Sequence, residues 1–163
     1  MRQKFDQETA QSAVAVNQLI AEWGYELDIN NGTTITDLLT TDCKYAVGGT
    51  VFNDHAGIKQ FYAARNERVR TQQKDGVRTQ RHSITNQVLS FPDRTHATAT
   101  FTLVNYSAGG KPPIMDLVGP TIIADVRMAF RREADGLWRI AEFDSTPVFI
   151  GNDPFLNASV VKK

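Results

Sequence analysis

The hydrophobic period of this chain changes once, near Thr79, from about 3.6 residues to two. Before that point apolar side chains recur at three- and four-residue steps, and after it they alternate with polar ones. The first pattern predicts amphipathic helices and the second predicts strands with one buried face. Helices followed by consecutive long strands favour an α+β fold, in which a curved antiparallel or mixed sheet wraps around three N-terminal helices and leaves an internal pocket.

Three helices are expected in the first half of the chain. The first carries an apolar stripe that ends at Asp28 and consists of Ala13, Val16, Leu19, Ile20, Trp23 and Leu27. Thr34 or Thr36 can begin a short second helix, and Asp54 is a suitable N-cap for a third. One face of the third helix carries Ile58, Phe61, Tyr62, Arg65 and Val69.

Strands are expected on either side of several turn signals. Gly48-Gly49 predicts a short hairpin between residues 43–47 and 50–52. The long strands are expected at residues 81–91, 97–106, 121–132 and 137–143. We expect residues 1–163 to form a single domain with its core at about 10–148, and residues 149–163 to form a C-terminal tail or flap.

Composition and spacing exclude several classes of function. Lys+Arg and Asp+Glu each number 18, which argues against a nucleic-acid partner. Cys43 is the only cysteine, and the spacing of His55, His82 and His96 matches no zinc motif. The chain has no phosphate-binding glycine motif and no long apolar run. We therefore expect a cytoplasmic protein with no cofactor, no metal and no membrane partner.

Asp28 and His82 are the candidate catalytic pair. Alternation places His82 on the inner face of its strand, and Asp28 projects beyond the stripe of the first helix. A carboxylate beside an imidazole in a pocket fixes the ring tautomer and makes the ring a better general base. The alternative is a structural one, a helix-terminal aspartate and a histidine satisfied in the core. A Cys43–His82 nucleophile pair is a further alternative, but a half-buried structural cysteine fits position 43 better.

Five more residues are candidate substrate-binding groups. Trp23 can supply an aromatic wall and Tyr45 a phenol donor, while Asn86 shares the predicted inner face of His82 and can bind a carbonyl or hydroxyl group. Phe101 is expected to face inward beside small alanines that leave room for a cavity. Tyr106 faces outward by simple alternation and turns inward only if a bulge intervenes. Each inward residue also fits an ordinary core role.

Three segments carry a resemblance to a known family. They read WGYELDINNGTTITDLLTTDCKYAVGG, TQRHSITNQVLSF and FRREADGLWRIAEF. Together, over about residues 13–147, they resemble the SnoaL-like branch of the nuclear transport factor 2-like superfamily. The resemblance implies a cone-shaped fold with a deep pocket and a homodimer or homotrimer. The layout is similar to scytalone dehydratase and hexachlorocyclohexane dehydrochlorinase, whose catalytic aspartate and histidine fall on Asp28 and His82.

The sequence departs from both enzymes. Asn105 and Tyr106 lie where the dehydratase has a second catalytic histidine, and Trp23 replaces a lysine of the dehydrochlorinase. In addition, Arg81, His82 and Asn86 match a pattern found in the small subunits of aromatic-ring-hydroxylating dioxygenases, which are mainly structural.

The sequence therefore predicts one of two functions. The first is a cofactor-independent lyase or isomerase in which Asp28 orients His82 to abstract a proton from a small apolar substrate, aromatic or alicyclic. The second is a non-catalytic domain that binds a ligand or assembles with other subunits.

Overall fold

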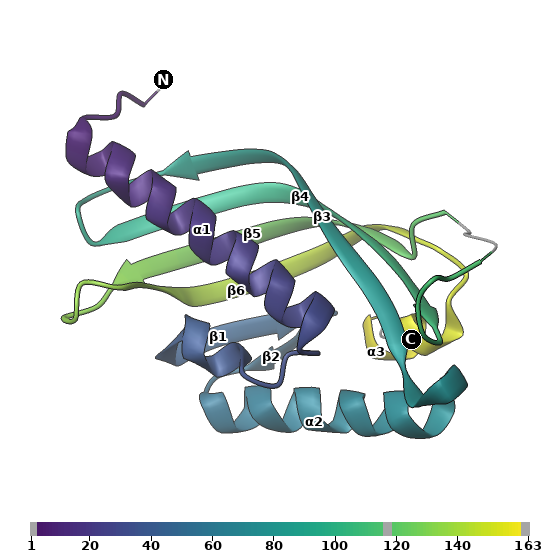
Figure 1. Ribbon diagram of the computed structural model, residues 1–163. Coiled ribbons are helices and arrows are strands. Elements are labelled where there is room, and N and C mark those ends of the chain that lie inside the picture. Colours follow the sequence, from purple (N-terminus) through teal and green to yellow (C-terminus); the bar gives the residue numbers. More distant parts are fainter. Residues whose placement is uncertain (1–2, 116–118, 161–163) are drawn as a thin grey trace.

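The computed structural model of this chain describes residues 3–115 and 119–160, with side chains to residue 158 (Figure 1). It is an α+β structure, as the change of period predicts. Its elements are α1 (Gln7–Ile29), η1 (Ile35–Leu38), β1 (Leu39–Val47), β2 (Thr50–Phe52), α2 (His55–Gln72), η2 (Lys74–Gly76), β3 (Arg78–Ser90), β4 (His96–Gly109), β5 (Ile122–Arg132), β6 (Trp138–Ile150) and α3 (Pro154–Val160).

The six strands form one mixed sheet in the order β2-β1-β6-β5-β4-β3. β3 to β6 pair antiparallel as a meander, whereas β1 pairs parallel to β6, with Leu39 opposite Ile140. The N-terminal hairpin is thus joined to the last strand of the sheet. α1 crosses one face of this sheet, and α2 lies beside β1 and β2 (Figure 1).

Both long helices begin at aspartate caps. Asp6 accepts a hydrogen bond from the Thr9 backbone N–H at 2.9 Å, and Asp54 accepts one from Gly57 at 2.7 Å. Such caps satisfy backbone donors that have no partner inside the helix. α1 continues one residue beyond the predicted end at Asp28, so that the Asp28 carboxylate projects from its last turn.

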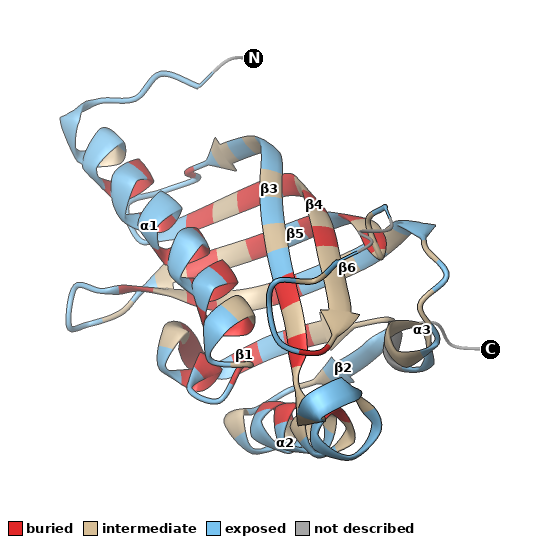
Figure 2. Cartoon of the chain, turned by 45° about the vertical axis from the view of Figure 1, so that its right-hand side comes forward, coloured by how far each residue is buried: buried red, intermediate tan, exposed pale blue. Residues whose placement is uncertain are grey.

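The core lies between α1 and the sheet face that it covers. Buried residues alternate along the strands on that face (Figure 2). From α1, Val16, Ile20 and Trp23 are almost fully buried, and Met128 and Ile140 of the sheet are fully buried. Each such side chain contributes roughly 1.5–3 kcal/mol through removal from water.

A bulge in β3 corrects one predicted face. The register with β4 shifts between Thr85 and Val88, and Asn86 has a φ of 54°. Because one extra residue exchanges the two faces of a strand, Leu89 packs against the core while Val88 is 64% exposed. The prediction that Asn86 shares the inner face of His82 is therefore wrong.

A second irregularity changes the partners on the outer face of the sheet. The register of β5 with β6 shifts next to Phe130, and Phe143 turns inward while Glu142 turns outward. Arg127 then forms an ion pair with Glu142 at 3.0 Å. Arg127 therefore pairs across to β6, on the outer face of the sheet.

The C-terminal region is more regular than a loose tail. β6 extends to Ile150, and α3 follows; residues 161–163 of the predicted tail lie outside the described residues.

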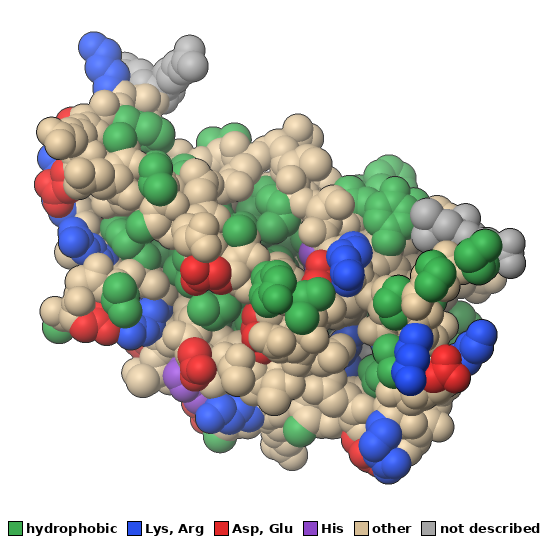
Figure 3. Space-filling view, in the orientation of Figure 1, with side chains coloured by type: hydrophobic (Ala, Val, Ile, Leu, Met, Phe, Trp, Pro, Cys, Tyr) green, Lys and Arg blue, Asp and Glu red, His purple; other side chains and the backbone are tan. Residues whose placement is uncertain are grey.

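Basic and acidic side chains intermingle on the face shown in Figure 3. In the ranges that the structure describes, no helix is long and apolar enough to cross a membrane.

Candidate active site

A cavity of about 120 Å³ lies between the sheet, α1, α2 and α3. Most of its wall is aromatic or aliphatic. Its polar wall residues are Arg65, Arg78, Gln80, His82, Asn105 and Ser145. An apolar pocket with a few converging polar groups is the usual form of a small-molecule site.

Asp28 of α1 contacts His82 of β3, and His82 belongs to the cavity wall. Oδ1 of Asp28 lies 2.6 Å from Nδ1 of His82, and Oδ2 accepts the His82 backbone N–H at 2.9 Å. Both side chains are about nine-tenths buried. One carboxylate therefore fixes both the ring and the backbone of the histidine, although the two residues are 54 positions apart in the sequence.

Asn105 of β4 contacts the other ring nitrogen. It lies opposite His82 in the register, and its Nδ2 is 2.9 Å from Nε2 of His82. The Thr121 hydroxyl donates to Oδ1 of Asn105 at 2.7 Å, which orients the amide nitrogen toward the imidazole. Nε2 is then the acceptor, and the ring proton lies on Nδ1, facing Asp28.

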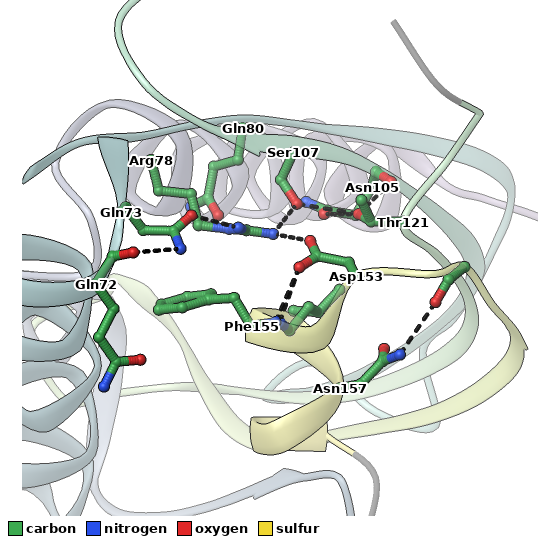
Figure 4. A network of polar contacts seen from close by, with 12 residues as sticks. Gln72, Gln73, Arg78, Gln80, Asn105, Ser107, Thr121, Asp153, Phe155 and Asn157 are labelled. Atoms are coloured by element: carbon green, nitrogen blue, oxygen red, sulfur yellow. Dashed lines mark hydrogen bonds and ion pairs between the residues drawn. The ribbon is translucent and has the colours of Figure 1, made fainter. Parts of the chain in front are cut away.

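The polar contacts continue from Thr121 to Arg78. Ser107 Oγ lies 3.0 Å from Thr121 Oγ1 and accepts from Arg78 at 2.6 Å. Figure 4 shows this part of the network, with Arg78 also paired to Asp153. Arg78 can only donate hydrogen bonds and Asp28 can only accept them. Each group in the series from Arg78 to Asp28 therefore donates a hydrogen bond to the next one.

α3 covers one side of the cavity. Phe155 and Leu156 belong to the cavity wall, and the Phe155 ring lies 4.7 Å from the guanidinium carbons of both Arg68 and Arg78. The side chain of Asp153 also accepts the Phe155 backbone N–H at 3.1 Å (Figure 4). The ion pair and the cation–π contacts together hold this helix against the pocket.

Trp23 and Tyr45 lie in the wall as predicted candidates, together with Tyr62. The indole N–H of Trp23 donates to Tyr45 Oη at 3.1 Å, and the two phenol oxygens are 2.8 Å apart. Burial raises the pKa of Tyr62 to about 12 and that of Tyr45 well above its usual value. Both phenols are therefore neutral near pH 7. They share one hydrogen bond, so one hydroxyl proton of the pair is available to a ligand.

Three predicted substrate-binding residues lie outside the cavity wall. Asn86 is exposed because of the β3 bulge, and Phe101 is packed in the core. Tyr106 lies opposite Arg81 in regular register, on the face opposite to its neighbour Asn105. β4 has no register shift at this point that would turn Tyr106 inward. The inner face predicted for Asn86 is therefore wrong, whereas Phe101 faces inward and Tyr106 outward, as alternation predicts.

The remaining cysteine and histidines lie apart from the site. Cys43 is completely buried, and its side chain is not part of the cavity wall. Nε2 of His55 lies 2.9 Å from the Thr40 carbonyl oxygen, and His96 contacts Asp93 on the surface. Among the described residues, no group of three His, Cys, Asp or Glu side chains is placed to hold a metal ion.

Several wall residues were not predicted as site residues, among them Arg78, Gln80, Tyr62, Arg65 and Asn105. Arg78 and Gln80 precede His82 by four and two positions, so period-two alternation already places them on its face. Tyr62 and Arg65 share the predicted inner face of α2, and Asn105 appeared only as a replacement for a family histidine. The periodicity of each element places most of these side chains inward, but periodicity alone does not show which inward polar side chains line a cavity.

A known protein family matches most of this chain. The model of the SnoaL-like domain matches residues 8–144. The chain belongs to the SnoaL-like family. The resemblance stated from the sequence is thereby confirmed, and the match includes both Asp28 and His82. A search of curated protein sequences found no match.

Solved structures share the fold of this SnoaL-like chain. An NTF2-like protein with a cystatin-like fold from Novosphingobium aromaticivorans has a TM-score of 0.65 and 18% identity, covering 96% of this chain and 97% of its own. A candidate scytalone dehydratase from the same organism has a TM-score of 0.64 and 13% identity, covering 90% of each chain. A candidate aromatic ring hydroxylase from Novosphingobium aromaticivorans has a TM-score of 0.67 and 17% identity, covering 86% of this chain and 91% of its own.

Proposed function

We propose that this protein is a cofactor-independent lyase or isomerase that acts on a small apolar molecule, aromatic or alicyclic. The observation that carries the proposal is the hydrogen bond of Asp28 to His82, whose side chain lines a largely apolar cavity. The family match and the dehydratase named among the structural neighbours support the same reaction class.

His82 acts as the general base in this proposal. Its Nε2 takes the proton from an activated C–H bond, and the electron pair of that bond moves toward a neighbouring carbonyl or expels a β leaving group such as hydroxide. Asp28 stabilises the imidazolium that forms, because its carboxylate already accepts the Nδ1 proton. In an isomerisation the proton returns at another carbon, and in an elimination it leaves with the product water.

Asn105 supplies the hydrogen bond to the oxygen that gains charge. In the absence of ligand its amide occupies Nε2 of His82, and it lies in the same cavity wall. A substrate C–H that approaches Nε2 displaces this amide, which then donates to the adjacent substrate oxygen. The phenol pair of Tyr45 and Tyr62 offers a second donor. Asn105 thus takes the role that the sequence analysis gave to Asn86.

The test uses two compounds with the reactive group in an alicyclic ketone. Loss of water from 3-hydroxy-1-tetralone gives 1-naphthol, and 2-tetralone exchanges its α protons with D₂O. We expect the wild-type protein to accelerate at least one reaction, with a loss of roughly 10²–10⁴-fold in His82→Ala. His96→Ala, which removes an exposed imidazole, is the matched control. Equal rates for wild type, His82→Ala and Asp28→Asn would overturn the proposal.

Subunit assembly is the second candidate function. The last residues of β6 expose apolar side chains, with Val148, Phe149 and Ile150 between 44% and 65% exposed. A strand end of this kind suits a contact with another chain. Native mass spectrometry separates the two proposals: a homodimer or homotrimer accompanies the enzyme proposal, and a hetero-complex with a larger partner favours assembly.

A further inference from the structure

Arg65 places a positive charge in the wall of the cavity. It lies on α2, one turn after Tyr62, and is part of the lining. Its Nη2 donates to Oε1 of Gln80 at 2.7 Å, and its Nη1 donates to Oδ1 of Asn66 at 3.2 Å. Both acceptors are neutral amide oxygens, so neither compensates the charge of the guanidinium.

No carboxylate forms an ion pair with Arg65 among the residues that the structure describes. The other arginine of the wall, Arg78, is paired with Asp153. The buried carboxylate of Glu26 accepts the Thr34 backbone N–H at 2.6 Å and the Asn30 amide at 2.7 Å. These acidic groups are therefore engaged elsewhere.

The surroundings of Arg65 disfavour its charge. Burial lowers the pKa of Arg65, and the guanidinium groups of Arg78 and Arg68 lower it further, against an opposing effect of Tyr62. Arg65 is partly buried. Removing a cation from water is costly unless it is paired, and guanidinium stays protonated at any ordinary pH. The cavity therefore has an unmatched cation that an anionic ligand group would compensate.

Gln80 fixes where this charge lies relative to the candidate base. Its amide oxygen accepts from Arg65, and its amide nitrogen donates to the Leu27 carbonyl at 2.5 Å, next to Asp28. Gln80 and His82 are two residues apart on β3 and share a face, which separates them by roughly 6.6–6.8 Å along the strand. Gln80 thus links Arg65 to the strand position two residues before His82.

We propose that Arg65 binds a carboxylate group of the ligand, and that the molecules this site accepts are small apolar acids. The guanidinium fork matches a carboxylate in shape and charge, and the aromatic wall accommodates the apolar remainder. Naming this ligand as the substrate rests on the proposed function. Binding of the carboxylate at Arg65 requires no turnover, so the two proposals can fail separately.

The test compares each acid with its neutral amide. The probes are benzoate with benzamide and 2-naphthoate with 2-naphthamide, titrated calorimetrically into the full-length protein. We expect at least one acid to bind tenfold or more tightly than its amide in the wild type. Arg65→Gln should reduce this ratio to about one, and Arg65→Lys, which keeps the charge, should retain part of it. Arg127→Gln, which removes a surface arginine of the outer sheet face, should leave the ratio unchanged.

Two results would overturn the carboxylate assignment. One is a wild-type protein that binds neither acid more tightly than its amide, and the other is an unchanged ratio in a folded Arg65→Gln variant. Circular dichroism and thermal melting verify the fold of both Arg65 variants. His82→Ala should keep the wild-type preference even where turnover is lost. A preserved preference in a protein whose turnover is unaffected by His82→Ala would reject the enzyme proposal alone.

Discussion

Asp28 contacts His82 through both of its carboxylate oxygens, one on the ring and one on the backbone N–H. The helix end and the strand start are therefore joined by a single side chain. Since a carboxylate only accepts, both histidine groups must donate to it. This arrangement determines which ring nitrogen carries the proton.

The neutral ring of His82 should be the Nδ1–H tautomer. An amide at position 28 can accept only through its oxygen, so Asp28→Asn loses one of the two contacts and the tautomer preference weakens. Turnover should then fall roughly 10²–10⁴-fold, the scale of lost general base catalysis. Ring ¹⁵N chemical shifts measure the tautomer directly. Identical ring shifts in wild type and variant would contradict the prediction.

Asn105→Leu should destabilise the protein by about 1–3 kcal/mol, because the Thr121 hydroxyl loses its side-chain acceptor and Nε2 of His82 loses its donor in a buried place. Urea denaturation measures the change. Asn17→Leu is the matched control, since Asn17 is exposed and accepts one hydrogen bond from Gln87; we expect a change within about 0.5 kcal/mol there. An equal decrease in the free energy of unfolding of the two variants would show that the buried Asn105 amide contributes no more than an exposed one.

The Cys43 thiol should be unreactive in the folded protein. Its side chain is completely buried, and burial raises the pKa of this thiol to about 12. Thiolate is the reactive form, so Ellman's reagent should modify Cys43 only when urea unfolds the chain. Cys43→Ala should leave turnover intact, because the side chain lies outside the cavity wall. Rapid labelling of the folded protein would refute this prediction.

Acid should weaken the fold partly through Asp42. Hydrogen bonds from Arg131 lower the pKa of Asp42 from its usual 3.8 to about 2. A carboxyl whose pKa is lowered on folding stabilises the native state above its unfolded pKa, and this stabilisation is lost as pH falls toward the folded value. We expect Asp42→Asn to lose part of the decline in Tm between pH 4 and pH 2. Since both residues are substantially exposed, the effect should be small and should shrink in high salt. A pH profile parallel to that of the wild type would exclude the contribution.

The order of the helices and strands was predicted well because each element is specified by residues that are close together in the sequence. The stripe of α1, the Asp54 cap and the hairpin at Gly48-Gly49 are all specified by neighbouring residues, and the structure has them. The juxtaposition of Asp28 and His82 followed from the end of one stripe and the inner face of one strand. The hydrogen bond between them in the structure supports that geometry, and their catalytic role stays a prediction.

What escaped prediction depends on register. The β3 sequence alone does not predict the bulge at Asn86. The bulge nevertheless exchanges the faces of the β3 residues that follow it. The outward turn of Glu142 follows in the same way from an irregular pairing between β5 and β6. Bulges are fixed by how two strands align, and a single strand's pattern does not contain that information.

The parallel pairing of β1 with β6 has a consequence for how the chain is made. Leu39 meets Ile140, so the hairpin near the start of the polypeptide has no sheet neighbour on that side until the last long strand has emerged from the ribosome. Until then the sheet face that α1 covers lacks β6, although β3, which carries His82, has already been made. Contacts between such distant segments form slowly because a long loop must close first. During synthesis, part of the apolar face of α1 is therefore exposed to solvent. A chaperone would protect the nascent protein most at this stage.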